Sequence, residues 1–290
     1  MTLLVDAYYT IGKMHLFCQD YASRGIDLFP YVILADGCSA TPDTDLGARL
    51  LALDARRLLR RFALAATDQR QRVIQHGRLG ERIVRRAARQ ARDLGVDTTV
   101  LDATLLIAWY HGQTVYVHLY GDGCVAARRV DGTVIAIEIE YAENAPYYLS
   151  YRLNPEREAL YQAAINDPTT AQRVYCWSKT GVTIRREPFD TPILFSFDLA
   201  AFPRVLVATD GLHSLVNVET QERLDSLAVA REVLDFHDLA GAFVQRRLRE
   251  VLTGYRQQGV FNIDDIGVGA FVNLDEDADM DTPTTRGTFV

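Results

Sequence analysis

Aspartates repeatedly stand at the ends of apolar, strand-like runs, usually beside a glycine. The pairs are Asp36-Gly37, Gly121-Asp122, Asp210-Gly211 and Asp264-Asp265. Each pair alone is ordinary turn chemistry, because aspartate and glycine both favour turns. Carboxylates at the ends of neighbouring strands, however, meet at one edge of a core and repel one another unless cations lie between them. Together, the four pairs predict a cation site.

Oxygen-only ligation of this kind suits Mg²⁺ or Mn²⁺. Two such ions held roughly 3.5–4 Å apart can deprotonate a bridging water and stabilise the oxygens of an in-line attack on phosphorus. The residues therefore predict an enzyme that acts on a phosphate ester, with Asp36, Asp210 and Asp264 as its principal metal ligands.

Short runs rich in β-branched and aromatic residues, bounded by turn residues, are expected to position these aspartates. The expected strands are 28–35, 105–110, 114–120, 134–140, 193–197, 205–209 and 266–272. Two glycine-containing turns, 111–113 and 131–132, lie between consecutive runs, as hairpin connections do. The sheets should therefore be mostly antiparallel.

Helical periodicity is clearest over residues 45–66 and 70–94, and the second segment is closed by Gly95. Residues 154–166 begin with Asn-Pro, which is typical of a helix start, and residues 239–256 are apolar at helical spacing. Helices thus alternate with blocks of strands rather than with single strands. That order favours an α+β layered domain over a doubly wound parallel sheet.

The composition indicates a globular protein, since 48% of its 290 residues are hydrophobic. With no long linker or internal repeat, we expect one domain over residues 1–272 and an acidic, disordered tail over 273–290. No secretory signal is visible, and no apolar run approaches the roughly 20 residues of a membrane-spanning helix. The four cysteines form no CxxC pair, which argues against zinc or a disulfide framework. We expect a cytoplasmic protein that contacts no membrane.

Charge is distributed unevenly. The chain has a net charge of −7, but residues 56–92 contain twelve arginines and only two acidic residues. Such a segment is either a surface for an acidic partner or the solvated face of a helix pair, and its helical spacing favours the second interpretation. Nucleic-acid binding is disfavoured, because Phe62 is the only aromatic residue there that could stack on a base.

Six short motifs occur in an order that resembles a known family. They are Cys18-Gln19-Asp20, Ala35-Asp36-Gly37, Asp102-Ala103-Thr104, Gly121-Asp122-Gly123, Ala208-Thr209-Asp210-Gly211-Leu212 and Asp264-Asp265-Ile266-Gly267. In this order they resemble the metal-dependent protein phosphatases of the 2C type, over nearly the whole chain from Asp20 to Val272.

The resemblance implies a four-layer αββα sandwich with two mostly antiparallel sheets and two Mn²⁺ or Mg²⁺ ions at one end. Asp36 matches the ligand that bridges the two ions, and the carbonyl of Gly37 matches a ligand of one of them. Asp210 and Asp264 match ligands of the other ion, and Asp122 matches the position of a third, weaker ion.

The reaction implied by the resemblance is hydrolysis of phosphoserine or phosphothreonine in a protein. A hydroxide that bridges the ions attacks directly, without a phosphoenzyme, and Asp20 orients water. The implied partner is a phosphorylated signalling protein, with a serine/threonine kinase acting in opposition. Segment 143–188 is the expected determinant of substrate choice, because variable loops over a fixed centre usually set it.

Three positions depart from the family pattern. Gln19 stands where the family has a ligating glutamate; its neutral oxygen can still bind a cation, but less strongly. His15 occupies the place of an arginine that grips the substrate phosphate, so it could contact phosphate or donate a proton. Cys38 and the two small residues after it replace the usual sequence following the metal aspartate. These departures keep open a second interpretation, a catalytically weak or inert module that binds a signalling partner.

Overall fold

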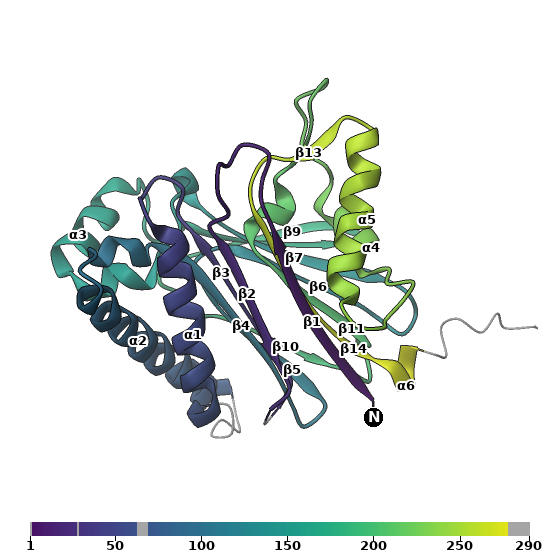
Figure 1. The fold of residues 1–290 in the computed structure, drawn as a ribbon, viewed down its shortest axis with the longest axis horizontal. Helices are drawn as coiled ribbons and strands as arrows, with labels where there is room; N and C mark the ends of the chain where they lie inside the picture. Colours follow the sequence, from purple (N-terminus) through teal and green to yellow (C-terminus); the bar gives the residue numbers. More distant parts are fainter. Residues whose placement is uncertain (1, 28, 63–68, 278–290) are drawn as a thin grey trace, which may run out of the picture.

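The protein is built in four layers, two sheets facing each other with helices outside each (Figure 1). This computed structural model describes residues 2–27, 29–62 and 69–277. Helices α1 (Thr44–Phe62) and α2 (Gln69–Asp93) cover one sheet. Helices α4 (Ser226–Leu234) and α5 (Phe243–Gln257) cover the other. The expected α+β sandwich is confirmed.

Both large sheets are antiparallel throughout, as the hairpin connections predicted. The five-stranded sheet has the order β10 (Ile193–Asp198), β5 (Thr114–Tyr120), β4 (Ala103–His111), β3 (Tyr31–Gly37) and β2 (Asp20–Gly25). The seven-stranded sheet has the order β1 (Leu3–Thr10), β14 (Ile266–Asn273), β11 (Arg204–Ala208), β6 (Gly123–Arg128), β7 (Val134–Tyr141), β8 (Gln172–Ser178) and β9 (Gly181–Glu187).

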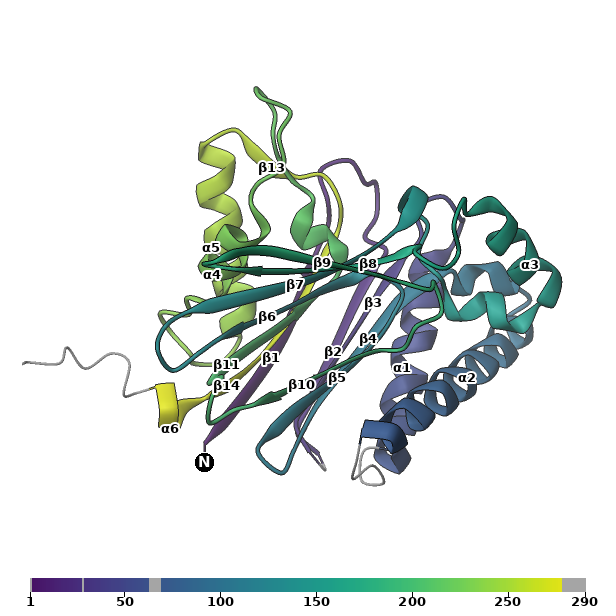
Figure 2. The same cartoon turned by 180° about the vertical axis from the view of Figure 1, so that it is seen from behind.

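Shorter elements connect these layers. They are η1 (Thr98–Leu101), η2 (Ala142–Asn144), η3 (Leu149–Leu153), α3 (Pro155–Ala164), η4 (Asp210–His213), β12 (Leu215–Asn217), β13 (Val260–Asn262) and α6 (Leu274–Asp277). The segment between β7 and β8, which includes η3 and α3, lies beside α2 (Figure 2).

Apolar side chains fill all three spaces between the layers. Strand β3 shows why its sequence is an unbroken apolar run. Ile33 packs under the α1–α2 pair, whereas Leu34 points the other way, into the space between the sheets, and both are fully buried. Successive side chains of a strand alternate between its two faces, so a strand covered on both faces needs apolar residues at every position.

All seven expected strands are present, and sequence reasoning missed others. Strands β1, β2, β6, β8 and β9, and helix α4, were not predicted. The expected helix over 239–256 begins only at Phe243, where the carboxylate of Asp6 accepts the backbone N–H of Val244 at 2.8 Å. Of the expected tail, residues 274–277 form α6 and 278–290 lie outside the described residues. No helix in the described ranges is long and apolar enough to span a membrane.

Candidate metal centre

The first two carboxylates of the site come from one strand pair in the five-stranded sheet. Asp20 is the first residue of β2 and lies directly opposite Asp36, near the end of β3. Directly opposed residues of an antiparallel pair project from the same face, so the two carboxylates lie side by side. Asp20 is buried, at 2% exposure, and Asp36 is partly buried.

The seven-stranded sheet supplies the remaining carboxylates. Asp210 follows β11 at the start of η4, and Asp264 precedes β14, the neighbour of β11. Gly211 allows these two segments to meet, because a Cβ there would lie 1.6 Å from the carbonyl oxygen of Asp265. Asp122 immediately precedes β6, which pairs with the other edge of β11. The strand-end aspartates therefore do converge at one end of the sandwich.

Burial and mutual charge repulsion both raise the pKa values of these carboxylates. Burial raises the pKa of Asp36 well above its ordinary value, and the charges of Asp20, Asp210 and Asp264 raise it further. The pKa of Asp264 is also raised, by burial first and then by Asp210. Carboxylates that alter one another's pKa in this way share one low-dielectric site.

Several carboxylate oxygens in the cluster have no partner. Oδ1 of Asp20, of Asp122 and of Asp210 is buried and makes no hydrogen bond to any described residue. The other oxygen of Asp20 accepts a hydrogen bond from the hydroxyl of Thr209 at 2.8 Å. Burial raises the pKa of Asp20, although hydrogen bonds from Asp36 and Thr209 oppose the increase. Unpartnered buried oxygens are costly, and a hard cation would satisfy them.

A small cavity of about 90 Å³ adjoins this cluster. Its acidic lining residues are Asp122, Glu138, Glu140, Asp210 and Asp264. Burial raises the pKa of Asp122 well above its ordinary value, and Asp210 and Asp264 contribute. Acidic oxygens around a small cavity fit a divalent cation. Among the described residues, no three His, Cys, Asp or Glu side chains are already arranged to hold a metal ion.

Gln19 and Gly37 lie at the predicted place beside Asp36. The side-chain amide of Gln19 donates to the hydroxyl of Thr44 at 2.6 Å and to the carbonyl of Cys38 at 3.3 Å. The backbone N–H of Gly37 donates to the carbonyl of Gln19 at 3.2 Å. The amide nitrogen of Gln19 thus holds the turn after β3. Ligation by its oxygen, and by the Gly37 carbonyl, stays a prediction.

His15 lies at the rim of the cluster, held between two acidic side chains. Its Nε2 is 3.3 Å from Asp264 Oδ1, and its Nδ1 is 3.1 Å from Asp265 Oδ2. Asp265, which sequence reasoning did not single out, also accepts the backbone N–H groups of Gly12 at 2.7 Å and Gln19 at 2.6 Å. Asp265 therefore fixes the loop between β1 and β2 against the site. The only signal for it in the sequence is its place beside Asp264.

Comparison with known proteins identifies the family. The family described as protein phosphatase 2C matches residues 12–253. The chain belongs to the protein phosphatase 2C family. No similar sequence is found among curated proteins.

Solved structures show the same fold in bacterial phosphatases. The serine/threonine phosphatase Stp1 from Staphylococcus aureus is 12% identical, with a TM-score of 0.54 over 94% of this chain and 96% of that one. The Mycobacterium tuberculosis serine/threonine phosphatase PstP/Ppp is 16% identical, with a TM-score of 0.52 over 94% and 99%. PppA from Pseudomonas aeruginosa, a key regulatory component of T6SS, is 17% identical, with a TM-score of 0.53 over 94% and 98%.

This phosphatase 2C chain brings one further side chain to the cluster that its motifs did not indicate. Tyr148 precedes η3 and is only 7% exposed. Burial raises the pKa of its hydroxyl, and the next contributions come from Asp122 and from Cys38. The Tyr148 side chain therefore brings the β7–β8 segment close to the candidate centre. Sequence reasoning missed Tyr148 because Asp122 and Cys38 are distant from it in the sequence.

Asp102 anchors the β7–β8 segment of this phosphatase 2C fold. One of its oxygens accepts the hydroxyl of Ser150 at 2.5 Å, and the other accepts the guanidinium of Arg157 at 2.7 Å. Asp102 is buried and directly precedes β4, so these bonds tie η3 and α3 to the sheet that carries Asp36. Asp102, the aspartate of the third motif, thus anchors the segment that contains Tyr148.

Backbone strain and a buried histidine mark the other side of the centre. Glu143 and Asn144 both have left-handed backbones, with φ of 57° and 52°, and Asn144 lines the small acidic cavity. Such strain in residues other than glycine clusters at functional sites. His213 lines the same cavity, and its Nδ1 lies 2.8 Å from the hydroxyl of Ser226. Burial lowers the pKa of His213 to about 4, so the ring is neutral near pH 7.

Proposed function

We propose that this phosphatase 2C protein hydrolyses phosphoserine and phosphothreonine in proteins with the help of two Mn²⁺ or Mg²⁺ ions. The observation that carries the proposal is the cluster of carboxylates formed by Asp20, Asp36, Asp210 and Asp264, whose charges raise one another's pKa. Buried oxygens of Asp20 and Asp210 have no hydrogen-bond partner among the described residues. Family membership supports a serine/threonine phosphatase function.

In this proposal Asp36, the Gly37 carbonyl, Asp210 and Asp264 would hold the two ions. Gln19 adds a neutral ligand, and Asp122 belongs to a third, weaker site. When bound, the ions would supply a water acidic enough to act as the nucleophile and would stabilise charge on the phosphoryl oxygens.

The residues around these ligands have their own proposed tasks. The Oδ1 of Asp20 has no partner and can accept a hydrogen bond from the attacking water, while Thr209 holds the other oxygen. His15 lies at the rim within reach of Asp264, where it contacts the substrate phosphate or gives a proton to the leaving alkoxide. Asp264 and Asp265 orient its ring from both sides.

The proposed substrate is a phosphorylated signalling protein of the cytoplasm, with a serine/threonine kinase acting in opposition. Residues 143–188, which comprise the β7–β8 segment and strands β8 and β9, are the proposed determinant of substrate choice, because they carry Tyr148 to the centre and are held by Asp102. Exchanging this segment for that of another family member should change the preferred phosphopeptide. An unaltered peptide preference would remove the segment from substrate choice.

The decisive test is hydrolysis of p-nitrophenyl phosphate and of a phosphothreonine peptide, each with Mn²⁺, with Mg²⁺ and with EDTA. We expect turnover that requires the metal and that is lost in Asp210→Asn. Asp131→Asn is the matched control, since Asp131 lies in an exposed turn and carries the same chemical change. The proposal fails if the folded, Mn²⁺-loaded wild-type protein turns over neither substrate.

One observation favours a second function, an inert or weak module that binds a signalling partner. The amide of Gln19 is committed to Thr44 and Cys38, so the position where the family has a ligating glutamate lacks its charge and takes part in a structural bond network instead. Under this alternative, the protein binds phosphopeptides with Mn²⁺ present but does not hydrolyse them. Phosphate release measured beside peptide binding distinguishes the two functions.

A further inference from the structure

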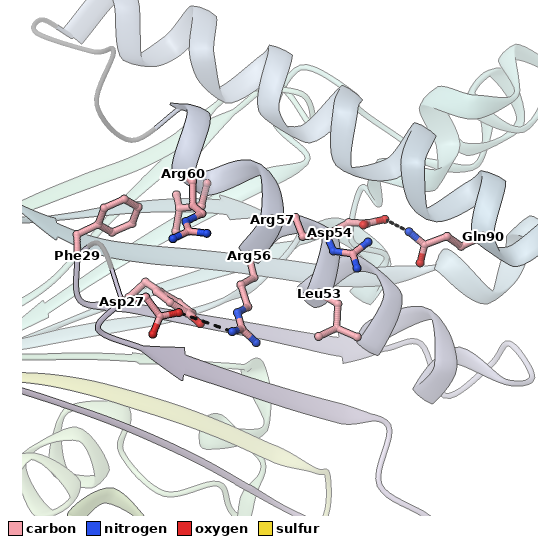
Figure 3. A pocket seen from close by; sticks show the side chains of 10 residues that line it. Asp27, Phe29, Leu53, Asp54, Arg56, Arg57, Arg60 and Gln90 are labelled. Atoms are coloured by element: carbon pink, nitrogen blue, oxygen red, sulfur yellow. Dashed lines mark hydrogen bonds and ion pairs between the residues drawn. The ribbon is translucent and has the colours of Figure 1, made fainter.

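A second cavity lies at the opposite end of β3 from the candidate metal centre. It has a volume of about 420 Å³ and opens between α1 and the turn that joins β2 to β3 (Figure 3). Its lining residues are Asp27, Phe29, Tyr31, Leu53, Asp54, Arg56, Arg57, Leu59, Arg60 and Gln90. Five residues along β3 separate Tyr31 from Asp36, or about 16 Å, so the cavity is separate from the metal centre.

Two positive charges in this cavity are left without a counterpart. Asp54 is already neutralised, because Arg86 Nε donates to one oxygen at 2.6 Å and Gln90 Nε2 to the other at 2.7 Å. Asp27 faces Arg56 at 3.7 Å, and both side chains are at least half exposed.

Arg57 and Arg60 have no ion pair or hydrogen bond with any part of the chain that the structure describes. They lie at the cavity beside Phe29 and Asp54 (Figure 3). The cavity therefore has an excess of two guanidinium groups. A guanidinium group matches the charge and geometry of a phosphate group.

The rest of the lining is apolar and aromatic. Phe29, Tyr31 and Leu59 are buried, whereas Leu53 is 41% exposed at the cavity. The hydroxyl of Tyr31 is also buried and has no hydrogen-bond partner among the described residues. Small-molecule sites are usually lined by apolar and aromatic side chains with a few polar groups, and this cavity has that composition. Its volume also lies in the usual range for such sites.

We propose that this cavity binds a small phosphomonoester that carries an aromatic ring, of the nucleoside monophosphate class. The phosphate would pair with Arg57 and Arg60, and the ring would pack on Phe29 and Tyr31. A phosphomonoester carries close to two negative charges at pH 7, which matches the two unpaired arginines. This site requires no metal and does not depend on the reaction proposed for the centre.

Calorimetric titration with AMP and GMP, in EDTA and at low salt, tests the proposal. EDTA removes the cations through which a phosphatase centre would itself bind phosphate. We expect saturable binding of at least one of the two nucleotides, with adenosine or guanosine alone, and inorganic phosphate alone, each binding more weakly. Charge-assisted hydrogen bonds are worth roughly tenfold to a hundredfold in affinity, so the double variant Arg57→Ala, Arg60→Ala should weaken binding by at least about tenfold.

Two further variants separate binding from folding. Arg61→Ala is the matched control, because Arg61 is an exposed neighbour on α1 outside the cavity lining, and its affinity should equal that of the wild type. Tyr31→Phe removes the unpartnered hydroxyl but keeps the ring. It should weaken nucleotide binding without lowering the melting temperature of the ligand-free protein, since an unused buried hydroxyl stabilises nothing.

Three results would overturn the assignment. They are the absence of saturable binding of either nucleotide, binding that the double arginine variant leaves unchanged, and inorganic phosphate binding as tightly as the nucleotide. Binding of an acidic peptide in place of nucleotides would assign the cavity to a different ligand and would equally reject the proposal.

Discussion

The hydroxyl of Thr209 should be a principal support of the candidate centre, and Thr209→Val tests this. The hydroxyl donates to Asp20 Oδ2 at 2.8 Å and accepts the backbone N–H of Gly267 at 2.8 Å. Thr209 is 2% exposed, so water cannot replace either bond. Valine has nearly the same shape, so the variant removes both hydrogen bonds and leaves almost no cavity.

The expected cost follows from those two bonds. A hydrogen bond to a carboxylate contributes about 1.5–3 kcal/mol, and an unsatisfied buried N–H costs about 1–3 kcal/mol. These terms overlap, so we expect the free energy of unfolding to fall by about 2–4 kcal/mol. Urea unfolding in EDTA measures this change without a contribution from metal.

Thr209→Ser is the matched control, because it keeps the hydroxyl and loses only a methyl group, at a cost of about 1 kcal/mol. Loss of the bond to Asp20 should also weaken Mn²⁺ binding about 10- to 100-fold, as changes at residues that orient metal ligands do. If the valine variant unfolds within about 0.5 kcal/mol of the wild type, or the serine variant loses as much as the valine variant, the reasoning about Thr209 is wrong.

Three other predictions concern two buried histidines, Gln19 and Ser150. Burial lowers the pKa of His118 to about 3, and that of His76 well below its ordinary value. The unfolded chain therefore binds more protons below about pH 6.5, and stability should fall by about 1.4 kcal/mol per pH unit and histidine as the pH drops toward 3. Urea unfolding between pH 7.5 and 5 should show this, and His118→Phe should reduce the slope; an equal slope in the variant would contradict it. Gln19→Glu adds a charge to the centre, so Mn²⁺ should bind more tightly by calorimetry, and unchanged binding would exclude Gln19 as a ligand. Ser150→Ala removes a bond to Asp102 at 2.5 Å, so KM for a phosphopeptide should rise severalfold while p-nitrophenyl phosphate turnover is retained. Equal effects on both substrates would show that this bond does not act on peptide binding.

The layered fold could be predicted because its inner strands are buried on both faces. Such strands read as unbroken apolar runs, and those that end at an aspartate, such as β3 and β11, also indicate the site. The missed strands lack that signal. Strand β2 contains Asp20, Ser23 and Arg24, and β9 is exposed along nearly its whole length. Their places are set by partners across the sheet rather than by their own composition.

The residues that support the site were harder to predict than its carboxylates. Thr209 and Asp20 are 189 residues apart, and Asp265 and Gln19 are 246 apart. A short motif carries no information about such contacts, because only the folded sheets bring the partners together. Tyr148 shows the same limit, since nothing in its local sequence indicates that its hydroxyl lies close enough to Asp122 and Cys38 for them to raise its pKa.

The energetic cost of the centre bears on the choice between an enzyme and an inert module. No described Lys or Arg is paired with Asp20, Asp36 or Asp210, and each of these fully or partly buried carboxylates lies among other carboxylates. Replacing buried charges by apolar residues of similar volume is often stabilising, so a chain selected only to bind a partner could lose this cluster with a gain in stability. Stability is commonly sacrificed where a function requires it.

The hydrogen bonds of Thr209 and Asp265 also favour a cation-binding centre. They hold the mutually repelling carboxylates and the adjoining loop in place rather than relieving the repulsion. This balance favours a centre that holds cations, and it is the physical reason for preferring the enzyme.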